Sequence, residues 1–291
     1  MAGPLVVGVD GSDDSFRALD WAADEATRHA LPLRLVHASR WERYEGTALV
    51  LSLGRPAERV LADDIVGAAA ERATLRHADL DVSTQVLGDD PETVLLREGH
   101  EASAVVVGSR GRGAFTGLLL GSVGLAVAAR AQCPVIVVRG DKAGLEGTHE
   151  RILVGVGDSP KGSEALRFAF REAEVRGCTL EAVRAWRSPA HESTDHPLLA
   201  GEPERHHEDR AAALLDEGLA EEAGEHPAVR VRRATVEAPA HRVLAHRSAA
   251  ADLLVIGAPR RQSKFGLQLG RVAHAALHHA ACPVAVVSQR A

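Results

Sequence analysis

Four small residues with a fixed spacing could build an anion-binding site. Gly108 and Gly111 follow an apolar run, and after residues 112–120 come Gly121 and Ser122, which gives the pattern G-x2-G-x9-G-S. Glycines lack a Cβ and therefore let backbone and ligand approach each other closely. If a helix begins after Gly121, the free backbone amides of its first turn attract phosphate. The spacing therefore indicates a site for a phosphorylated ligand.

Asp10 is the acidic residue best placed to act with these glycines. It ends the apolar run of the segment LVVGVDGS, and open parallel sheets bind ligands beyond the carboxyl ends of their strands. Its carboxylate could hold a ribose hydroxyl, an adenine edge or a bound Mg²⁺. Arg110 and Arg112 flank Gly111 and could neutralise phosphate charge, or could be solvated loop residues. The sequence leaves these alternatives open.

Two common nucleotide-binding motifs are absent from the sequence. It contains no Walker motif, and G-x-G-x-x-G does not follow the first apolar run, so P-loop NTPases and Rossmann dehydrogenases fit poorly. An ATP-consuming enzyme also needs groups that orient water and stabilise charge on the γ-phosphate. Ser122, Asp10 and the loop arginines are the only candidates, so we assign no catalytic residue.

An internal repeat sets the organisation of the chain. Residues 106–138 (VVGSRGRGAFTGLLLGSVGLAVAARAQCPVIVV) return in register as residues 255–287 (VIGAPRRQSKFGLQLGRVAHAALHHAACPVAVV). The opening segment LVVGVDGS likewise returns as ILVGVGDS. A length of 291 residues also argues for about two domains. We expect homologous domains at 1–140 and 151–291, joined by a Gly-rich, charged linker at 141–150.

Each half alternates short apolar runs with longer segments of helical period, the pattern of parallel strands joined by crossover helices. Ser12 is a suitable N-cap for the first helix of the first half, and Ser159-Pro160 for its counterpart in the second. The fold class is therefore α/β. The strands expected in the first half lie near residues 4–9, 33–38, 82–87, 104–108 and 134–138.

Composition excludes several classes of function. The chain is 45% hydrophobic and 25% charged, with a formal net charge of -6, so there is no general electrostatic reason to bind nucleic acid or an acidic membrane. The longest uncharged run, 113–129, is shorter than the ~20 apolar residues of a membrane span. The N-terminus lacks the basic region of a secretory signal. We expect a cytoplasmic protein without nucleic-acid or membrane partners.

These motifs together resemble the universal stress protein family of the ATP-binding type. The glycine signature is present in full in the first half, and the segments VVGVDGS and CPVIVV also look like that family. Two copies cover nearly the whole chain, which is similar to tandem-domain members. The resemblance implies two Rossmann-like, doubly wound open parallel sheets of five strands each, in the order 3-2-1-4-5.

The resemblance also implies which residues bind ATP and Mg²⁺ in the first domain. The nucleoside would lie beside Gly8, Val9 and Asp10, and the backbone of Ala38 would contact the adenine edge. The ribose would lie beside Val107, Gly108 and Gly111, and the phosphates beside Gly121, Ser122 and Val123.

The expected function is that of a stress-response regulatory module in which ATP occupancy modulates conformation or partner binding. Family resemblance implies slow or no hydrolysis, sometimes with self-phosphorylation, so a slow ATPase is one alternative. A nucleotide-free interaction scaffold is the other.

The second half departs from the signature at three positions, and we expect that it does not bind ATP in the same manner. The aligned pairs are Asp10 with Gly157, Gly111 with Arg260, and Ser122 with Arg271. An alternative is that Arg260, Arg261, Lys264 and Arg271 form a cationic pocket for another phosphorylated ligand, because guanidinium groups bind phosphate bidentately.

Histidines gather in the second half, where ten of the fifteen fall at or after His191. His274 and His278 lie four apart on an expected helix, a spacing that can bind zinc. The sequence has no HExxH and no CxxC pair, and we therefore expect no metal site. An irregular segment carries the further candidate ligands His191, Asp195, His196, His206 and His207.

The terminal apolar strands, CPVIVV and CPVAVV, bear on assembly. An apolar edge strand left unpaired invites aggregation. We expect these two strands to pair within one chain as an intramolecular pseudo-dimer, and two chains could then associate as a homodimer.

Overall fold

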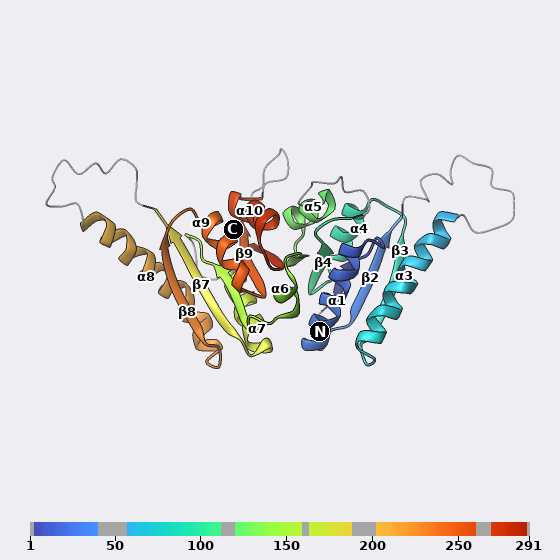
Figure 1. Ribbon diagram of the computed structural model, residues 1–291, viewed down its shortest axis with the longest axis horizontal. Coiled ribbons are helices and arrows are strands. Elements are labelled where there is room, and N and C mark those ends of the chain that lie inside the picture. The colour runs from blue at the N-terminus through green and yellow to red at the C-terminus, as the bar shows by residue number, and fades with distance from the viewer. Residues whose placement is uncertain are drawn as a thin grey trace. The chain divides into compact units, whose positions relative to one another are not determined.

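The computed structural model describes residues 3–39, 57–111, 120–158, 163–187, 202–259 and 269–289. The chain forms two compact units, and the boundary between them in the sequence lies between Arg139 and Gly140. Figure 1 colours both along the chain. Among the described residues, none of the helices combines the length and the hydropathy that crossing a bilayer requires.

The first unit is built on a five-stranded parallel sheet in the order β3-β2-β1-β4-β5. The predicted fold class, strand positions and strand order are confirmed here. Helices α1 (Asp13–Arg28) and α3 (Ala57–Arg76) pack together on one face, and α4 (Pro91–Glu98) and α5 (Ser122–Arg130) on the other. The strands are β1 (Leu5–Gly8), β2 (Leu33–Ala38), β3 (Val82–Leu87), β4 (Ala104–Gly108) and β5 (Val135–Val138).

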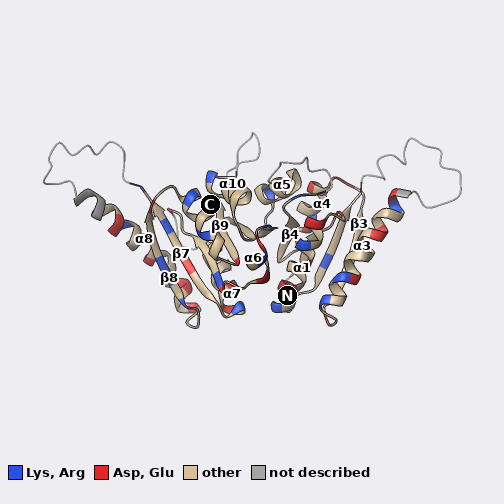
Figure 2. Cartoon of the chain, in the orientation of Figure 1, with Lys and Arg blue, Asp and Glu red and all other residues tan. Residues whose placement is uncertain are grey.

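Burial explains why the central strands of this sheet are continuously apolar. Val105, Val106 and Val107 of β4 are each at most 5% exposed, because helices cover the sheet on both faces. Figure 2 shows acidic and basic residues interspersed along α3, whereas β4 and β5 carry neither. The strand ends that carry the site are thus held by a core in which the central strands are apolar.

The turn between β1 and α1 follows the predicted capping. Gly11 adopts a left-handed conformation with φ of 77°, which favours glycine. Ser12 is the N-cap, and its Oγ accepts a hydrogen bond from the Ser15 amide at 3.2 Å. Asp13 and Asp14 occupy the first turn, where the helix dipole favours negative charge.

The second unit repeats the sheet in the order β8-β7-β6-β9-β10. Its strands are β6 (Arg151–Gly155), β7 (Thr179–Trp186), β8 (Val231–Glu237), β9 (Leu253–Pro259) and β10 (Val284–Gln289). Its helices are α7 (Glu164–Arg176), α8 (Glu202–Glu225), α9 (Ala240–Arg247), the short 3₁₀ helix η2 (Ser248–Ala250) and α10 (Arg271–His279).

The start of α7 differs from the prediction. The helix begins at Glu164 with Ser163 as its N-cap, and the Ser163 Oγ accepts from the Leu166 amide at 3.4 Å. Ser159 and Pro160 lie outside the described residues. Two serines precede this helix, and Ser163 is held in place because its Oγ also accepts from Gln289 Nε2 at 2.7 Å. That contact joins distant parts of the sequence, so the local pattern could not reveal it.

Residues 141–150, the expected linker, contain the short helix α6 (Lys142–Glu146) and pack on the second unit. Asp141 caps this helix through a 2.9 Å bond from the Gly144 amide, and its own amide donates to the Ala281 carbonyl. The buried Asp252 carboxylate accepts from the amides of His149 and Arg151, both at 2.9 Å. These contacts fix the entry into β6.

Candidate functional site

A cavity of about 430 Å³ lies at the carboxyl ends of β1, β2 and β4, beside the start of α5. Arg110 lines it, whereas Arg112 lies outside the described residues. The structure also brings all ten residues of the expected nucleotide site into its wall. They are Gly8, Val9, Asp10, Ala38, Val107, Gly108, Gly111, Gly121, Ser122 and Val123.

The Asp10 carboxylate is held in a fixed position by the turn that follows β1. Its Oδ1 accepts from the Ser12 amide at 3.0 Å and from the Ser12 hydroxyl at 2.6 Å. The Asp10 amide donates to the Ser15 Oγ at 3.4 Å. Two charge-assisted bonds to one oxygen restrict the rotation of the carboxylate. Asp10 therefore presents a pre-oriented acceptor to the cavity.

The glycines of the signature serve different purposes. A Cβ on Gly111 would lie 2.5 Å from Asp10 Oδ2, so glycine is needed here for the carboxylate to approach the loop after β4. A Cβ on Gly108 would lie 2.6 Å from the Asp14 carbonyl oxygen. Gly108 thus lets α1 pack closely on the end of β4 and also lines the cavity.

The start of α5 presents free backbone amides to the cavity. Gly121 is the N-cap and provides no side-chain cap, and its own amide donates to the Ser109 carbonyl at 2.7 Å. The amides of Ser122, Val123 and Gly124 are the first three of the helix and have no intrahelical acceptor. All three residues line the cavity. This helix terminus attracts anions.

Arg110 is anchored by a buried carboxylate. Its Nε donates to Asp14 Oδ2 at 3.1 Å, and the Ser109 hydroxyl donates to the same oxygen at 3.0 Å. Asp14 is 7% exposed and also pairs with Arg17. Arg110 is therefore an arginine that lines the cavity and is oriented by the first turn of α1, rather than an untethered loop residue.

Sequence reasoning missed two parts of the cavity wall, namely helix α4 and the side chain of His37. Pro91, Val94 and Leu95 of α4 line the cavity, and the Leu95 methyls lie 3.1 and 3.2 Å from the position of a Cβ on Gly8. Their spacing predicts an apolar helix face, but not its position over β1. The other lining residues that the sequence did not indicate are Ser15, Val36, His37 and Gly124.

His37 links the ends of two strands. Its Nδ1 lies 2.7 Å from the Val9 carbonyl oxygen. Because a carbonyl only accepts, Nδ1 carries the proton, and in the neutral ring Nε2 is then an acceptor. The bond fixes the imidazole at the edge of the cavity.

The corresponding region of the second unit is filled by a guanidinium group. Arg184 stands where the first half has His37, and it is 7% exposed. Its guanidinium donates to the Gly157 carbonyl and, at 2.9 Å, to Asp158 Oδ1. It also reaches the Val156 carbonyl at 3.5 Å, as His37 reaches that of Val9. The longer side chain thus occupies the end of β6, where the first unit has Asp10.

A second side chain covers the glycine of β9. Gln289 Nε2 lies 2.3 Å from the position of a Cβ on Gly257, the counterpart of Gly108. Arg271 begins α10, as predicted from the alignment of the halves. Arg260, Arg261 and Lys264 lie outside the described residues. The described residues of the second unit therefore do not reproduce the lining of the signature cavity.

In the described part of the chain, the cysteines and the pair His274 and His278 do not line the cavity of the first unit. Burial raises the pKa of the Cys133 thiol to about 11 and also raises that of Cys178, so both are protonated at neutral pH. The rings of His274 and His278 lie 4.5 Å apart. Among the described residues, no group of three potential metal ligands within 4.8 Å of one another includes either histidine.

Comparisons with known proteins agree with the repeat. The model of the universal stress protein family matches residues 1–139 and 148–288. A universal stress protein of Mycobacterium tuberculosis is 34% identical over 303 residues, covering 98% of this chain and 97% of that protein. One from Mycolicibacterium smegmatis is 32% identical over 291 residues, covering 98% and 97%.

A solved structure shares the fold over the full length. The crystal structure of a universal stress protein from Archaeoglobus fulgidus has a TM-score of 0.69 at 19% identity, covering 99% of this chain and 98% of that one.

Proposed function

The chain belongs to the universal stress protein family, and from this premise we propose that its first unit is a regulatory module that binds an adenine nucleotide. The ligand is ATP with Mg²⁺. Occupancy of the cavity modulates the conformation of the unit or its surface for partners.

The observation that carries this proposal is the pairing of a fixed carboxylate with an uncapped helix terminus in one cavity. Asp10 lies at one side, and the amides of Ser122, Val123 and Gly124 begin α5 at the other. A nucleotide requires both features, because its ribose hydroxyls donate to a carboxylate and its phosphates accept from amides. Between them, apolar Val36 and Leu95 suit the faces of a base.

The proposed roles follow from this placement. Gly8, Val9 and Asp10 flank the nucleoside, and the backbone of Ala38 contacts the adenine edge. Val107, Gly108 and Gly111 border the ribose. The phosphates lie beside Gly121 and accept from the amides of Ser122 and Val123, with Arg110 as a further donor. Mg²⁺ takes oxygen ligands, and it would neutralise phosphate charge together with Asp10, whose carboxylate lines the cavity.

Binding can change conformation because the ligand contacts separate segments. The turn after β1, the end of β2, the loop after β4 and the start of α5 all contribute to the cavity. A nucleotide that contacts all four favours the arrangement in which they converge. The Asp14 carboxylate already couples two of these segments, since it accepts from Ser109 and Arg110.

We expect the protein to retain ATP rather than turn it over. Hydrolysis needs a group that orients the attacking water, and the Asp10 Oδ1 is already engaged by Ser12. Purified protein should release adenine nucleotide on acid extraction, identified by mass. With ATP and Mg²⁺ it should liberate no phosphate above a protein-free blank overnight. Repeated turnover would make it an enzyme, and a protein free of nucleotide that binds none would make it a scaffold.

We further propose that the terminal strands pair into an intramolecular pseudo-dimer. β5 ends the strand order of its unit, and Val135, Ile136, Val137 and Val138 are all apolar and buried, an edge that invites pairing. Separately expressed residues 1–140, carrying an affinity tag, should retain residues 141–291 on a column. Val137→Lys should reduce this retention, with thermal unfolding of the isolated first half as the folding control. Absence of retention between the unaltered halves would refute the pairing.

A further inference from the structure

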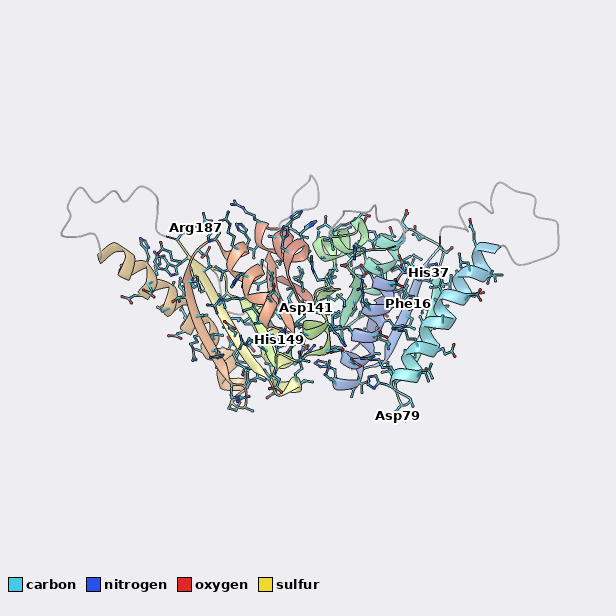
Figure 3. The ribbon with its side chains drawn as sticks, viewed as in Figure 1. Phe16, His37, Asp79, Asp141, His149 and Arg187 are labelled. Atoms are coloured by element: carbon cyan, nitrogen blue, oxygen red, sulfur yellow. The ribbon has the colours of Figure 1, made fainter. Side chains whose placement is uncertain are left out.

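The second unit contains a cavity at the equivalent strand and helix ends, but its lining differs from that of the first unit. It measures about 580 Å³ and lies between the end of β7, the helix α8 and the starts of α9 and α10. Arg184, Arg187, Arg210 and Arg271 line it, and Asp158 is the only carboxylate among its described lining residues. Figure 3 labels Arg187 beyond the end of β7. A strongly basic cavity in a chain of net charge -6 requires a reason.

Pairing within the protein does not neutralise these charges. Asp158 pairs with Arg184, at 2.9 Å. Arg187, Arg210 and Arg271 have no ion-pair partner within the described part of the chain. Three guanidinium groups around one hollow repel each other unless an anion lies between them.

A buried donor adds a second, independent observation. Arg184 is 7% exposed, and its Nε is buried without a hydrogen-bond partner among the described residues. Leaving a buried charged donor unsatisfied is costly, and native proteins seldom do so without a ligand or ordered water. The Nε atom itself is closed to solvent, but Arg184 lines the cavity, and a bound anion would stabilise the charge of its guanidinium group.

The backbone dipoles of two helices also make the potential in this cavity more positive. Helix α9 begins at Ala240 and helix α10 at Arg271, and neither has a side-chain cap at its N-terminus. Pro239, Ala240, Arg271 and Val272 all line the cavity. Two helix N-termini at one cavity add their positive potential to that of the arginines, and they also supply free backbone amides.

We propose that this cavity binds a small molecule that carries two or more phosphate groups. Guanidinium groups match phosphate bidentately, and several arginines with two helix N-termini exceed what one phosphate would use. Trp186, which lies over the His207 ring with centroids 6.4 Å apart, and Leu214 provide apolar wall for an organic part of the ligand. The ligand does not lie as in the first unit, because Arg184 fills the end of β6.

Inorganic tripolyphosphate is the probe that tests the phosphate part of this proposal on the full chain. Trp186 lines the cavity, so its fluorescence reports on this site, and Trp186→Phe should remove the signal while calorimetry still detects binding. Arg210→Ser and Arg271→Ser, both at exposed positions, should each weaken binding about tenfold, the usual value of one charge-assisted contact. Arg271→Ser also restores the residue that the first unit carries.

Arg242→Ser is the matched control, because Arg242 is an exposed arginine on α9 that does not line the cavity. It should leave the affinity unchanged within about twofold, a difference too small for a lost direct contact. Equal weakening by Arg242→Ser would overturn the proposal in favour of diffuse charge attraction. The proposal would also be overturned if tripolyphosphate did not bind at about 1 mM, which means a binding free energy weaker than about −4.1 kcal/mol.

A nucleic-acid partner is the remaining outcome that would contradict the proposal. In that case a short single-stranded oligonucleotide would bind more tightly than tripolyphosphate and would lose affinity in the same two variants. The fluorescence result is independent of the first unit, since Trp186 and both variants lie in the second. Failure here would leave the proposed nucleotide site of the first unit untouched.

Discussion

Replacing Gly111 with arginine should abolish nucleotide binding by the first unit while the unit stays folded. Even a Cβ at this position would lie 2.5 Å from Asp10 Oδ2, so the carboxylate must move out of the position set by Ser12. The rest of the arginine side chain would then enter the cavity or pair with Asp10. The second half carries arginine at the aligned position, Arg260.

We expect the ATP affinity to fall by at least about 100-fold, which corresponds to about 2.7 kcal/mol. This is the size expected when a charge-assisted contact is lost. Hydrogen exchange of residues 120–130, followed by mass spectrometry through an ATP titration, reports on the start of α5 alone. Gly111→Ala should give a smaller loss, because it displaces Asp10 without filling the cavity.

Gly224→Arg is the control for charge and size. Gly224 lies on α8, is exposed, and has nothing within 4 Å of its added Cβ. The ATP-binding curve of the Gly224→Arg variant should match that of the unaltered chain. If Gly111→Arg bound ATP with unchanged affinity, Gly111 and Asp10 would not form part of the site.

Gly108→Ala should destabilise the first unit more than any other methyl addition at the site. The new Cβ would lie 2.6 Å from the Asp14 carbonyl oxygen and 2.7 Å from its carbon. Both are backbone atoms of the first turn of α1, so the helix itself must shift. Overpacking of this kind costs about 3 kcal/mol. The shift would also disturb the Asp14 bonds to Ser109 and Arg110.

Urea denaturation is the measurement, with emission of the buried Trp21 of α1 as the reporter for this unit. Trp41 and Trp186 are replaced by Phe in every variant so that Trp21 reports alone. Gly67→Ala is the matched control, since Gly67 lies inside α3 with nothing within 4 Å of its added Cβ. It should stabilise the unit by about 0.5–1 kcal/mol. Equal stability of the two alanine variants would show that α1 does not pack on Gly108 as described.

The elements that sequence analysis located correctly are those with local causes. The strands of the first unit fall within one or two residues of their expected ranges because each is a short apolar run between turns. Ser12 was recognisable as an N-cap because capping depends on residues only three apart. The glycine signature is likewise contiguous with its strand and helix, and its residues meet in one cavity.

The features that sequence analysis missed depend on contacts between distant residues. Ser163, not Ser159, starts α7, and it is held by Gln289 from the end of the chain. The role of Gly108 follows from the approach of α1, more than ninety residues earlier. Arg184 could be recognised as filling the end of β6 only once β7 was placed beside β6. Packing, rather than local pattern, determines each of these.

The central claim is that the cavity of the first unit holds an adenine nucleotide between Asp10 and the start of α5. A crystal structure of the full chain grown with ATP and Mg²⁺ tests it most directly. We expect ordered adenine beside the Ala38 backbone, ribose at Asp10, and phosphate oxygens within hydrogen-bonding distance of the Ser122 and Val123 amides. A well-ordered cavity that contains only protein side chains or solvent under those conditions would contradict it.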